Sequence, residues 1–252
     1  MPSGFSRQYL AEQLTHILGE SLSGRELEKC IQSLEIIEPP IAKQFWQAAT
    51  ASAGIYIVLG GKVRLLDSAH NLITTLSTGA SFGELTLFPD ADFIPYVARA
   101  SVNLKVGYLP QGILQELMGE TSSVGDRLKK HAETWDLLVL CCQNSLLPQN
   151  PSVEEIIKAL ALFERHTLDI GSLPSQIFPD TKLWILRRGE LENNNGRTFQ
   201  PGTISQYSKQ IKWQVTQSAI VYILKHGNWQ VAQEYWPELG TGDWGLGTGE
   251  NG

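Results

Sequence analysis

The chain has 252 residues, of which 42% are hydrophobic and 18% charged, with a formal net charge of −6 and a pI near 5.4. This length suits one large domain or two small ones, and either buries a sizeable core. The acidic balance argues against a nucleic-acid binder, which presents a basic face. No apolar run approaches the roughly 20 residues that span a bilayer, and three cysteines without metal-like spacing indicate reduced thiols. We therefore expect a cytoplasmic protein without direct membrane insertion, metal site or nucleic-acid partner.

Two amphipathic helices are predicted within residues 5–34. Apolar side chains recur at three- and four-residue spacing from Phe5 to Leu18, which is the period of one helix face. Ser23 is expected to cap the second helix, with Glu26 at its third position, in the arrangement called a capping box. A pair of prolines then ends the helical region, because the residue before a proline disfavours helical backbone.

Short strands replace the helices over residues 36–109. The β-branched and aromatic run at residues 55–59 leads through Gly60-Gly61 into residues 62–66, which is typical of a β-hairpin. Similar runs follow at spacings of about ten residues, and this predicts a small β-sandwich or barrel. The further strands are expected at residues 72–76, 96–101 and 104–109.

Helices are predicted again over residues 111–145, where two apolar stripes run at helical spacing. These stripes are a candidate homodimer interface. His131 falls on the longer stripe and is expected to be a packed helix residue, since no second metal-type residue stands at matching spacing. The proline-bounded residues 147–151 are the best linker in the chain. The first domain is therefore expected to cover residues 1–146.

The chain beyond the linker is predicted to repeat the first domain in a shorter form. Ser152 is expected to cap a new helix, and residues 56–63 then align with residues 184–191. Further on, Gly79 aligns with Gly202 and Val106 with Val221, and between these two positions the second domain is eight residues shorter. Residues 152–239 therefore read as a second, degenerate β-roll. The glycine-rich, repetitive tail at residues 240–252 is expected to be disordered.

The eight missing residues cover the turn that carries the candidate ligand site of the first domain. Gly83 lets the backbone turn tightly and approach a ligand closely. Glu84 beside it offers two acceptor oxygens, which suit a pair of sugar hydroxyls, and free N–H groups in such a turn can form a nest for phosphate. The candidate ligand-binding residues are Phe82, Gly83, Glu84 and Leu85.

Residues 54–64 and 79–85 together resemble a cyclic nucleotide-binding domain, and the likeness covers about residues 20–145. The resemblance implies a fold that is mainly β with flanking helices (α+β), a cupin-like β-roll between N-terminal and C-terminal helices. It also implies that Glu84 stands where the family's glutamate binds the ribose 2′-hydroxyl. An arginine ten positions further on pairs with the cyclic phosphate in that family.

This chain has Ile94, followed by Pro95, at the position of that arginine. Arg99 is the candidate replacement, although its strand matches one where the family's basic residue does not touch phosphate. Proline has no N–H to donate, and a buried phosphate without its charge-assisted partner loses several kcal/mol. We therefore expect cyclic nucleotide binding to be weak or lost, with cyclic nucleotide as the only candidate cofactor.

The sequence favours a non-enzymatic regulatory or sensory module. The five histidines are scattered without a partner spacing, and no phosphate loop is present. Alternatives are a working receptor for cyclic AMP or cyclic GMP, and a transcription regulator of the catabolite activator type, for which no helix-turn-helix is visible. A double, degenerate roll also resembles the N-terminal regulatory part of bacterial ABC exporters with a peptidase-like domain. The chain is thus expected to be the front part of, or a partner to, a larger membrane transporter.

Overall fold

The computed structural model describes residues 4–120, 122–147, 152–174, 178–206 and 213–240. The chain divides into two compact units, Met1–Val139 and Leu140–Gly252. The division falls inside one long helix, a few residues before the segment that was predicted as the linker. Residues 148–151 of that segment, and residues 241–252 of the tail predicted to be disordered, lie outside the described residues.

Two helices of the first unit begin at serine caps, and the cap at Ser23 is the one that the sequence predicts. Ser6 accepts a hydrogen bond from the backbone N–H of Tyr9, and Ser23 and Glu26 exchange both bonds of a capping box. Each cap satisfies backbone N–H groups that have no partner within the helix. The helices are α1 (Arg7–Leu18), α2 (Gly24–Ser33), α3 (Gln111–Glu120) and α4 (Ser122–Gln143), and α4 continues into the second unit.

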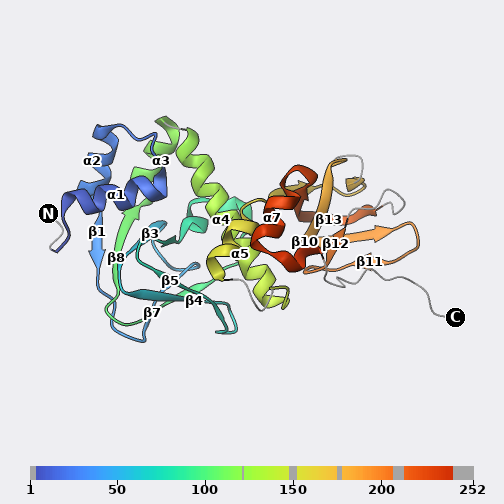
Figure 1. The fold of residues 1–252 in the computed structure, drawn as a ribbon, viewed down its shortest axis with the longest axis horizontal. Coiled ribbons are helices and arrows are strands. Elements are labelled where there is room, and N and C mark those ends of the chain that lie inside the picture. The colour runs from blue at the N-terminus through green and yellow to red at the C-terminus, as the bar shows by residue number, and fades with distance from the viewer. Residues whose placement is uncertain (1–3, 121, 148–151, 175–177, 207–212, 241–252) are drawn as a thin grey trace. The chain divides into compact units, whose positions relative to one another are not determined.

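Eight strands of the first unit form two four-stranded antiparallel sheets, with orders β1-β8-β3-β6 and β2-β7-β4-β5. Figure 1 shows α1, α2 and α3 beside the strands of the first sheet. The predicted fold class, mainly β with flanking helices, is confirmed. The strands are β1 (Glu35–Ile37), β2 (Gln44–Gln47), β3 (Gly54–Gly60), β4 (Lys62–Leu66), β5 (Leu72–Ser77), β6 (Ser81–Phe82), β7 (Val97–Ala100) and β8 (Lys105–Pro110).

Strand β3 divides the core of this unit into two parts, because alternate side chains of a strand point to opposite faces. Ile55, Ile57 and Leu59 are buried in the cluster that the helices α1 to α4 contribute to. Tyr56 faces the other way and its ring stacks on Phe82, with 5.3 Å between ring centroids. The helices therefore cover one face of the first sheet, and aromatic rings fill the inside of the roll.

The second unit holds one five-stranded antiparallel sheet with the order β11-β10-β13-β9, in which β12 also pairs with β10. A second capping box, between Ser152 and Glu155, begins its first helix as predicted. In Figure 1 the yellow α5 and the red α7 lie side by side. The elements are α5 (Val153–Leu160), β9 (Glu164–Leu168), β10 (Thr181–Asn193), β11 (Thr198–Phe199), β12 (Ile204–Gln206), β13 (Trp213–Lys225) and α7 (Trp229–Tyr235).

The central strand pairs of the two units share most of their register. The long strand β10 takes the place of β3 and β4, and β13 takes the place of β7 and β8, with a break in register at the same point of each pair. The turns before β6 and β12 are also alike: the Gly79 N–H donates to the Val58 carbonyl at 2.9 Å, and the Gly202 N–H donates to the Leu186 carbonyl at 2.8 Å. Equivalent pairs are Tyr56 with Phe82 and Tyr108, and Trp184 with Ser205 and Ile223.

The connection after β6 is longer than its equivalent in the second unit. Residues 83–96 connect β6 to β7, whereas residues 207–212, which lie outside the described residues, connect β12 to β13. The difference is the eight residues expected from the sequence. The segment that carries Gly83 and Glu84 is therefore an addition to a sheet that the second unit builds without it.

A paired glycine substitution tests this equivalence. Gly61 (φ 75°) and Gly189 (φ 86°) each stand where an added Cβ would lie 2.4 Å from a carbonyl oxygen, that of Asn103 or of Ser218. Alanine at either position should lower the free energy of unfolding by about 2–4 kcal/mol, because the strain of a positive φ adds to a clash with backbone. Urea unfolding of each variant measures this loss.

Gly196 (φ 74°) is the matched control, because the nearest atom to its added Cβ is 3.9 Å away. Gly196→Ala should therefore lower the free energy of unfolding only by the strain of the positive φ, about 1–2 kcal/mol. If Gly189→Ala and Gly196→Ala lower the free energy of unfolding equally, the close approach of the Ser218 backbone to Gly189 is contradicted.

Candidate functional site

Gly83 fixes the turn at the centre of the candidate site. It ends β6 with a left-handed backbone (φ 94°) and begins the short 3₁₀ helix η1 (Glu84–Leu87). A Cβ at this position would lie 2.8 Å from the Tyr56 ring, so both the conformation and the space require glycine. The hydroxyl of Thr86 donates to the Gly83 carbonyl at 2.7 Å and accepts from the Gly54 N–H at 3.1 Å. We call residues 82–96 the cassette.

Aromatic side chains close the inner side of the cassette. Phe82 is fully buried, and the ring of Trp46 lies edge-on to it with 5.5 Å between centroids. Tyr96, at the far end of the cassette, is also buried, and its hydroxyl accepts the Gly83 N–H at 2.9 Å. One backbone N–H that the sequence offered to a phosphate nest is therefore occupied by a side chain of the same segment.

Glu84 is buried completely, and its carboxylate is held from two elements. The Ser81 hydroxyl on β6 donates to Oε1 at 2.5 Å. His131 Nδ1, on α4, lies 3.0 Å from the same oxygen. Oε2 is buried and has no hydrogen-bond partner among the described residues. The predicted ribose-binding carboxylate is thus already engaged by the protein through one of its two oxygens.

The surroundings of Glu84 set its charge. Burial by itself raises the pKa of a carboxyl, but the attraction to His131 and the hydrogen bonds from His131 and Ser81 outweigh it and hold the pKa of Glu84 below its ordinary value. Tyr96 responds in the opposite direction: burial, together with the nearby Glu84 charge, raises its pKa well above the ordinary value. The cassette therefore contains an ionised carboxylate beside a neutral phenol.

Position 94 contacts a carboxylate where the resemblance implies a cation. The Ile94 N–H donates to Asp136 Oδ1 on α4 at 2.6 Å. Asp136 is only 2% exposed, so this anion lies inside the protein. Ile94 itself is half-buried and Pro95 is exposed. Two side chains of α4, His131 and Asp136, therefore contact the cassette at its two ends.

The remaining predicted site residues lie further from these contacts. Leu85 is half-buried in η1. Arg99 is exposed on β7, and its Nε donates to the Ala42 carbonyl at 2.7 Å. Glu84, in contrast, has no exposed surface. Phe82, Gly83 and Glu84 are brought together by the turn, whereas the guanidinium of Arg99 is directed to a different loop.

Sequence reasoning missed both α4 contacts. His131 was expected to be a packed helix residue, and Asp136 was not singled out. They stand 47 and 42 positions after their partners Glu84 and Ile94, so no local spacing connects them. The one available signal was that a histidine and an aspartate interrupt the apolar stripe of a predicted helix, where each needs a polar partner when buried.

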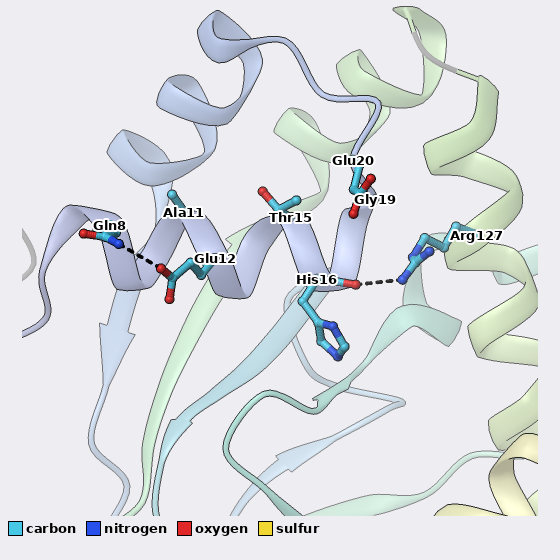
Figure 2. A pocket seen from close by; sticks show the side chains of 8 residues that line it. All are labelled: Gln8, Ala11, Glu12, Thr15, His16, Gly19, Glu20 and Arg127. Atoms are coloured by element: carbon cyan, nitrogen blue, oxygen red, sulfur yellow. Dashed lines mark hydrogen bonds between the residues drawn. The ribbon is translucent and has the colours of Figure 1, made fainter.

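A third polar contact fixes the first half of α4 against α1. Arg127 donates from Nε to the Ile17 carbonyl at 2.8 Å and from its terminal nitrogen to the His16 carbonyl at 2.7 Å. Figure 2 shows this side chain reaching the end of α1 across a groove that Glu12 and Glu20 also line. A cation at the C-terminus of a helix satisfies carbonyls that have no partner within it and complements the helix dipole.

The second unit offers an apolar cavity at the equivalent inner face of its sheet. Its walls include Trp184, Trp213 and Thr181, whose buried hydroxyl has no hydrogen-bond partner among the described residues. The cavity volume is about 20 Å³, which is room for a single water molecule. This cavity is too small for a nucleotide.

Neither a metal-ligand cluster nor a membrane-crossing helix is found in the part of the chain that the structure describes. No group of three or more His, Cys, Asp or Glu side chains there is placed to hold a metal ion. No described helix is both long and apolar enough to cross a membrane.

Part of the first unit matches a known protein family. Residues 45–121 match the family model described as Cyclic nucleotide-binding domain. These residues run from β2 to the end of α3 and include the whole cassette. Among curated proteins, none matches the chain.

Several solved structures are similar to the whole chain. The regulatory domain of Toxoplasma gondii PKA, solved with cAMP, is 13% identical with a TM-score of 0.43, covering 93% of this chain and 96% of that one. The regulatory subunit of a cAMP-independent protein kinase A from Trypanosoma brucei has 13% identity and a TM-score of 0.43, covering 95% and 93%. The Trypanosoma cruzi counterpart, bound to guanosine, has 12% identity and a TM-score of 0.43, covering 97% and 93%.

The lowered pKa of Glu84 predicts how its contribution to stability depends on pH. A carboxyl whose pKa is lower in the folded protein stabilises the fold above its unfolded pKa of about 4.3, and the contribution is lost as pH falls through the folded pKa. Glu84→Gln should therefore lower the free energy of unfolding by about 1–3 kcal/mol near neutral pH. The difference from the unaltered protein should shrink below about pH 4.3, in urea titrations from about pH 7 to about pH 3.5.

Glu12→Gln serves as the control, because Glu12 is an exposed acceptor on α1. Its effect should stay small at every pH. If Glu84→Gln lowers the free energy of unfolding by the same amount at every pH, the carboxylate charge does not stabilise the fold.

Proposed function

We propose that the chain is a non-enzymatic regulatory or sensory module that keeps the cyclic nucleotide-binding fold without tight cyclic nucleotide binding. The single observation that carries this proposal is the bond from the Ile94 N–H to the buried Asp136 carboxylate. An anion of the protein stands where a nucleotide phosphate would need a cation. A cyclic phosphate brought to position 94 would be repelled by that carboxylate and would have no charge-assisted partner there.

The contacts of Glu84 support the same proposal. A ribose hydroxyl could donate to Oε2, but the carboxylate is closed off from solvent and already paired with His131 and Ser81. Entry of a ligand therefore requires the site to open first, and that opening lowers the apparent affinity. What remains of a nucleotide site is one buried carboxylate oxygen, Oε2 of Glu84.

A non-enzymatic role agrees with the chemistry of the nearby nucleophiles. Ser81 and His131 contact the same carboxylate oxygen of Glu84. The Ser81 hydroxyl lies 2.5 Å from that oxygen and 3.4 Å from His131 Nδ1, so its shorter hydrogen bond is to the carboxylate and not to the imidazole that would activate it. Burial raises the pKa of the Cys30 thiol to about 11. Burial also raises the pKa of Cys141, so both thiols stay protonated and unreactive near neutral pH.

A working receptor for cyclic AMP or cyclic GMP is the second candidate, and one observation favours it. Glu84 stands in the turn that the family uses, and its Oε2 has no partner among the described residues. The doubled roll is the feature that suggests a membrane transporter as the partner of such a module. Co-purification of a transporter with the tagged chain would support that assignment.

Calorimetric titration separates the two candidates. The unaltered chain should give no saturable binding of cyclic AMP or cyclic GMP in the micromolar range, because Asp136 repels the phosphate and no cation replaces it. Ile94→Arg supplies the cation, and Ile94→Arg combined with Asp136→Asn also removes the competing anion. We expect micromolar binding only in the double variant, since Asp136 neutralises the new arginine in the single one.

Ile94→Leu is the matched control and should bind no more than the unaltered chain. Micromolar binding by the unaltered chain would overturn the proposed function in favour of the receptor. Failure of the double variant to bind would show that the anion at position 94 is not what prevents binding.

A further inference from the structure

One exposed sheet face of the first unit carries a group of cations, although the chain as a whole is acidic. The strands β7, β4 and β5 lie side by side (Figure 1). Arg99 on β7 stands directly opposite Arg64 on β4, and the same row ends at Gln44 on β2 and at Thr75 on β5. All four side chains are exposed. Lys62, two positions before Arg64, is exposed on the same side of β4. We call Lys62, Arg64 and Arg99 the basic face.

No carboxylate of this sheet balances the basic face. The four strands contain no Asp or Glu, and Asp67 is the only acidic residue in residues 39–83. Asp67 accepts the Asn71 N–H at 2.8 Å within its own loop, and Glu38 forms an ion pair with Lys105 at 3.1 Å. Among the described residues, none of the three cations takes part in an ion pair. In a chain with a net charge of −6, these cations are therefore kept apart from the acidic residues.

The register of the two arginines is unfavourable without an anion. Residues directly opposite on antiparallel strands have Cα atoms about 5 Å apart, and like charges in that position destabilise a sheet. Arg99 donates from Nε to the Ala42 carbonyl at 2.7 Å, which leaves its terminal nitrogens for a ligand. A guanidinium binds phosphate oxygens in pairs, so a phosphate between Arg64 and Arg99 replaces their repulsion with attraction. The basic face is therefore suited to a phosphate from outside the chain.

Two exposed aliphatic side chains lie at one end of the basic face. Ile41 is 62% exposed and Val102 is 61% exposed. The residue after Ile41 donates its N–H to the Ala100 carbonyl, at the end of β7, at 3.0 Å. The residue before Val102 donates its N–H to the Lys62 carbonyl, at the start of β4, at 3.0 Å. Both loops are therefore held at the same end of the sheet, beside Lys62.

This order of side chains matches the layers of an anionic lipid surface. The row of Arg64 and Arg99 lies two residues beyond Lys62, a rise of about 7 Å. A protein bound at a lipid surface places apolar side chains about 5–10 Å into the boundary of headgroups and acyl chains. Cations attract anionic headgroups within a Debye length, about 8 Å at physiological salt. With Ile41 and Val102 in that boundary, all three cations lie within reach of the headgroups.

A protein or a nucleic acid fits this surface less well. Protein interfaces have apolar side chains at the centre and polar ones at the rim, whereas here the cations are central and the aliphatic side chains stand at one end. A nucleic acid offers phosphates but no apolar layer for Ile41 and Val102. A lipid surface offers both.

We propose that the sheet β2-β7-β4-β5 docks on an anionic phospholipid surface. Headgroup phosphates bind Lys62, Arg64 and Arg99, and Ile41 and Val102 enter the layer below the headgroups. Docking is peripheral, and no helix in the described part of the chain is long and apolar enough to cross a membrane. None of these five residues belongs to the cassette, so the docking surface does not rest on the proposed function.

Vesicle co-sedimentation of the full chain at physiological salt tests the docking. The vesicles contain phosphatidylcholine alone, or phosphatidylcholine with about 30% phosphatidylserine. The unaltered chain should sediment only with the anionic vesicles, and less so as the salt concentration rises. Lys62→Gln combined with Arg64→Gln should weaken binding about tenfold or more, because each cation near the surface contributes about fivefold. Ile41→Ser combined with Val102→Ser should weaken it about tenfold at unchanged net charge.

A matched control separates the basic face from net charge. Arg25→Gln combined with Lys129→Gln removes the same charge from exposed positions on α2 and α4 and should leave binding nearly unchanged. Urea unfolding checks each variant. Loss of Lys62 and Arg64 should not destabilise the sheet, because it removes the repulsion with Arg99. The variant at Ile41 and Val102 gives a second test at two exposed positions.

Three results would overturn the proposal. The first is a failure of the unaltered chain to sediment with anionic vesicles, and the second is an equal loss of binding in the control at Arg25 and Lys129. The third is binding to heparin or polyglutamate, at the same salt, as tight as to the vesicles and unaffected by the changes at Ile41 and Val102. That result would assign the basic face to a polyanion in solution. Sedimentation without nucleotide does not depend on the calorimetric titration, so docking and the proposed function can fail separately.

Discussion

The first unit is arranged around one constraint, a carboxylate with no exposure to water. Glu84 begins η1 inside the protein, and an ionised group there is tolerated only with partners close by. Ser81 comes from the strand just before it, but His131 comes from α4, which follows the roll. The need to pair this carboxylate therefore places a helix against a loop that is distant in the chain. Asp136, Ile94 and the closed aromatic interior are consistent with that same placement.

The second unit shows what the roll requires without this carboxylate. Its central strand pair shares most of the register of β3 with β8, including one break in register, and a capping box begins its first helix. It lacks the insertion that holds Gly83 and Glu84 and has instead a short connection outside the described residues. The sheet therefore does not depend on the cassette for its fold. A buried carboxylate that the sheet can be built without calls for an explanation in terms of function.

Features that arise from local rules could be predicted from the sequence. Ser23 with Glu26 gives a capping box through a fixed spacing, and the glycine of the β3–β4 hairpin is needed because the local backbone has a positive φ. The division between units was predicted at a proline-bounded segment but falls inside α4, whose residues 134–141 are all buried. Contacts of His131 and Asp136 depend on how the helix packs, which no local pattern encodes.

Burial of Glu84 and the weak nucleotide binding that we propose are connected by one physical argument. A ligand that binds only an open state of the cassette has its apparent affinity reduced by the fraction of molecules that are open, so a site open about 1% of the time binds about 100-fold more weakly. In the proposed function, the missing cation at position 94 adds a second loss, because Asp136 places an anion there. Removing the repulsion alone leaves His131 on Glu84, and removing His131 alone leaves the anion in place.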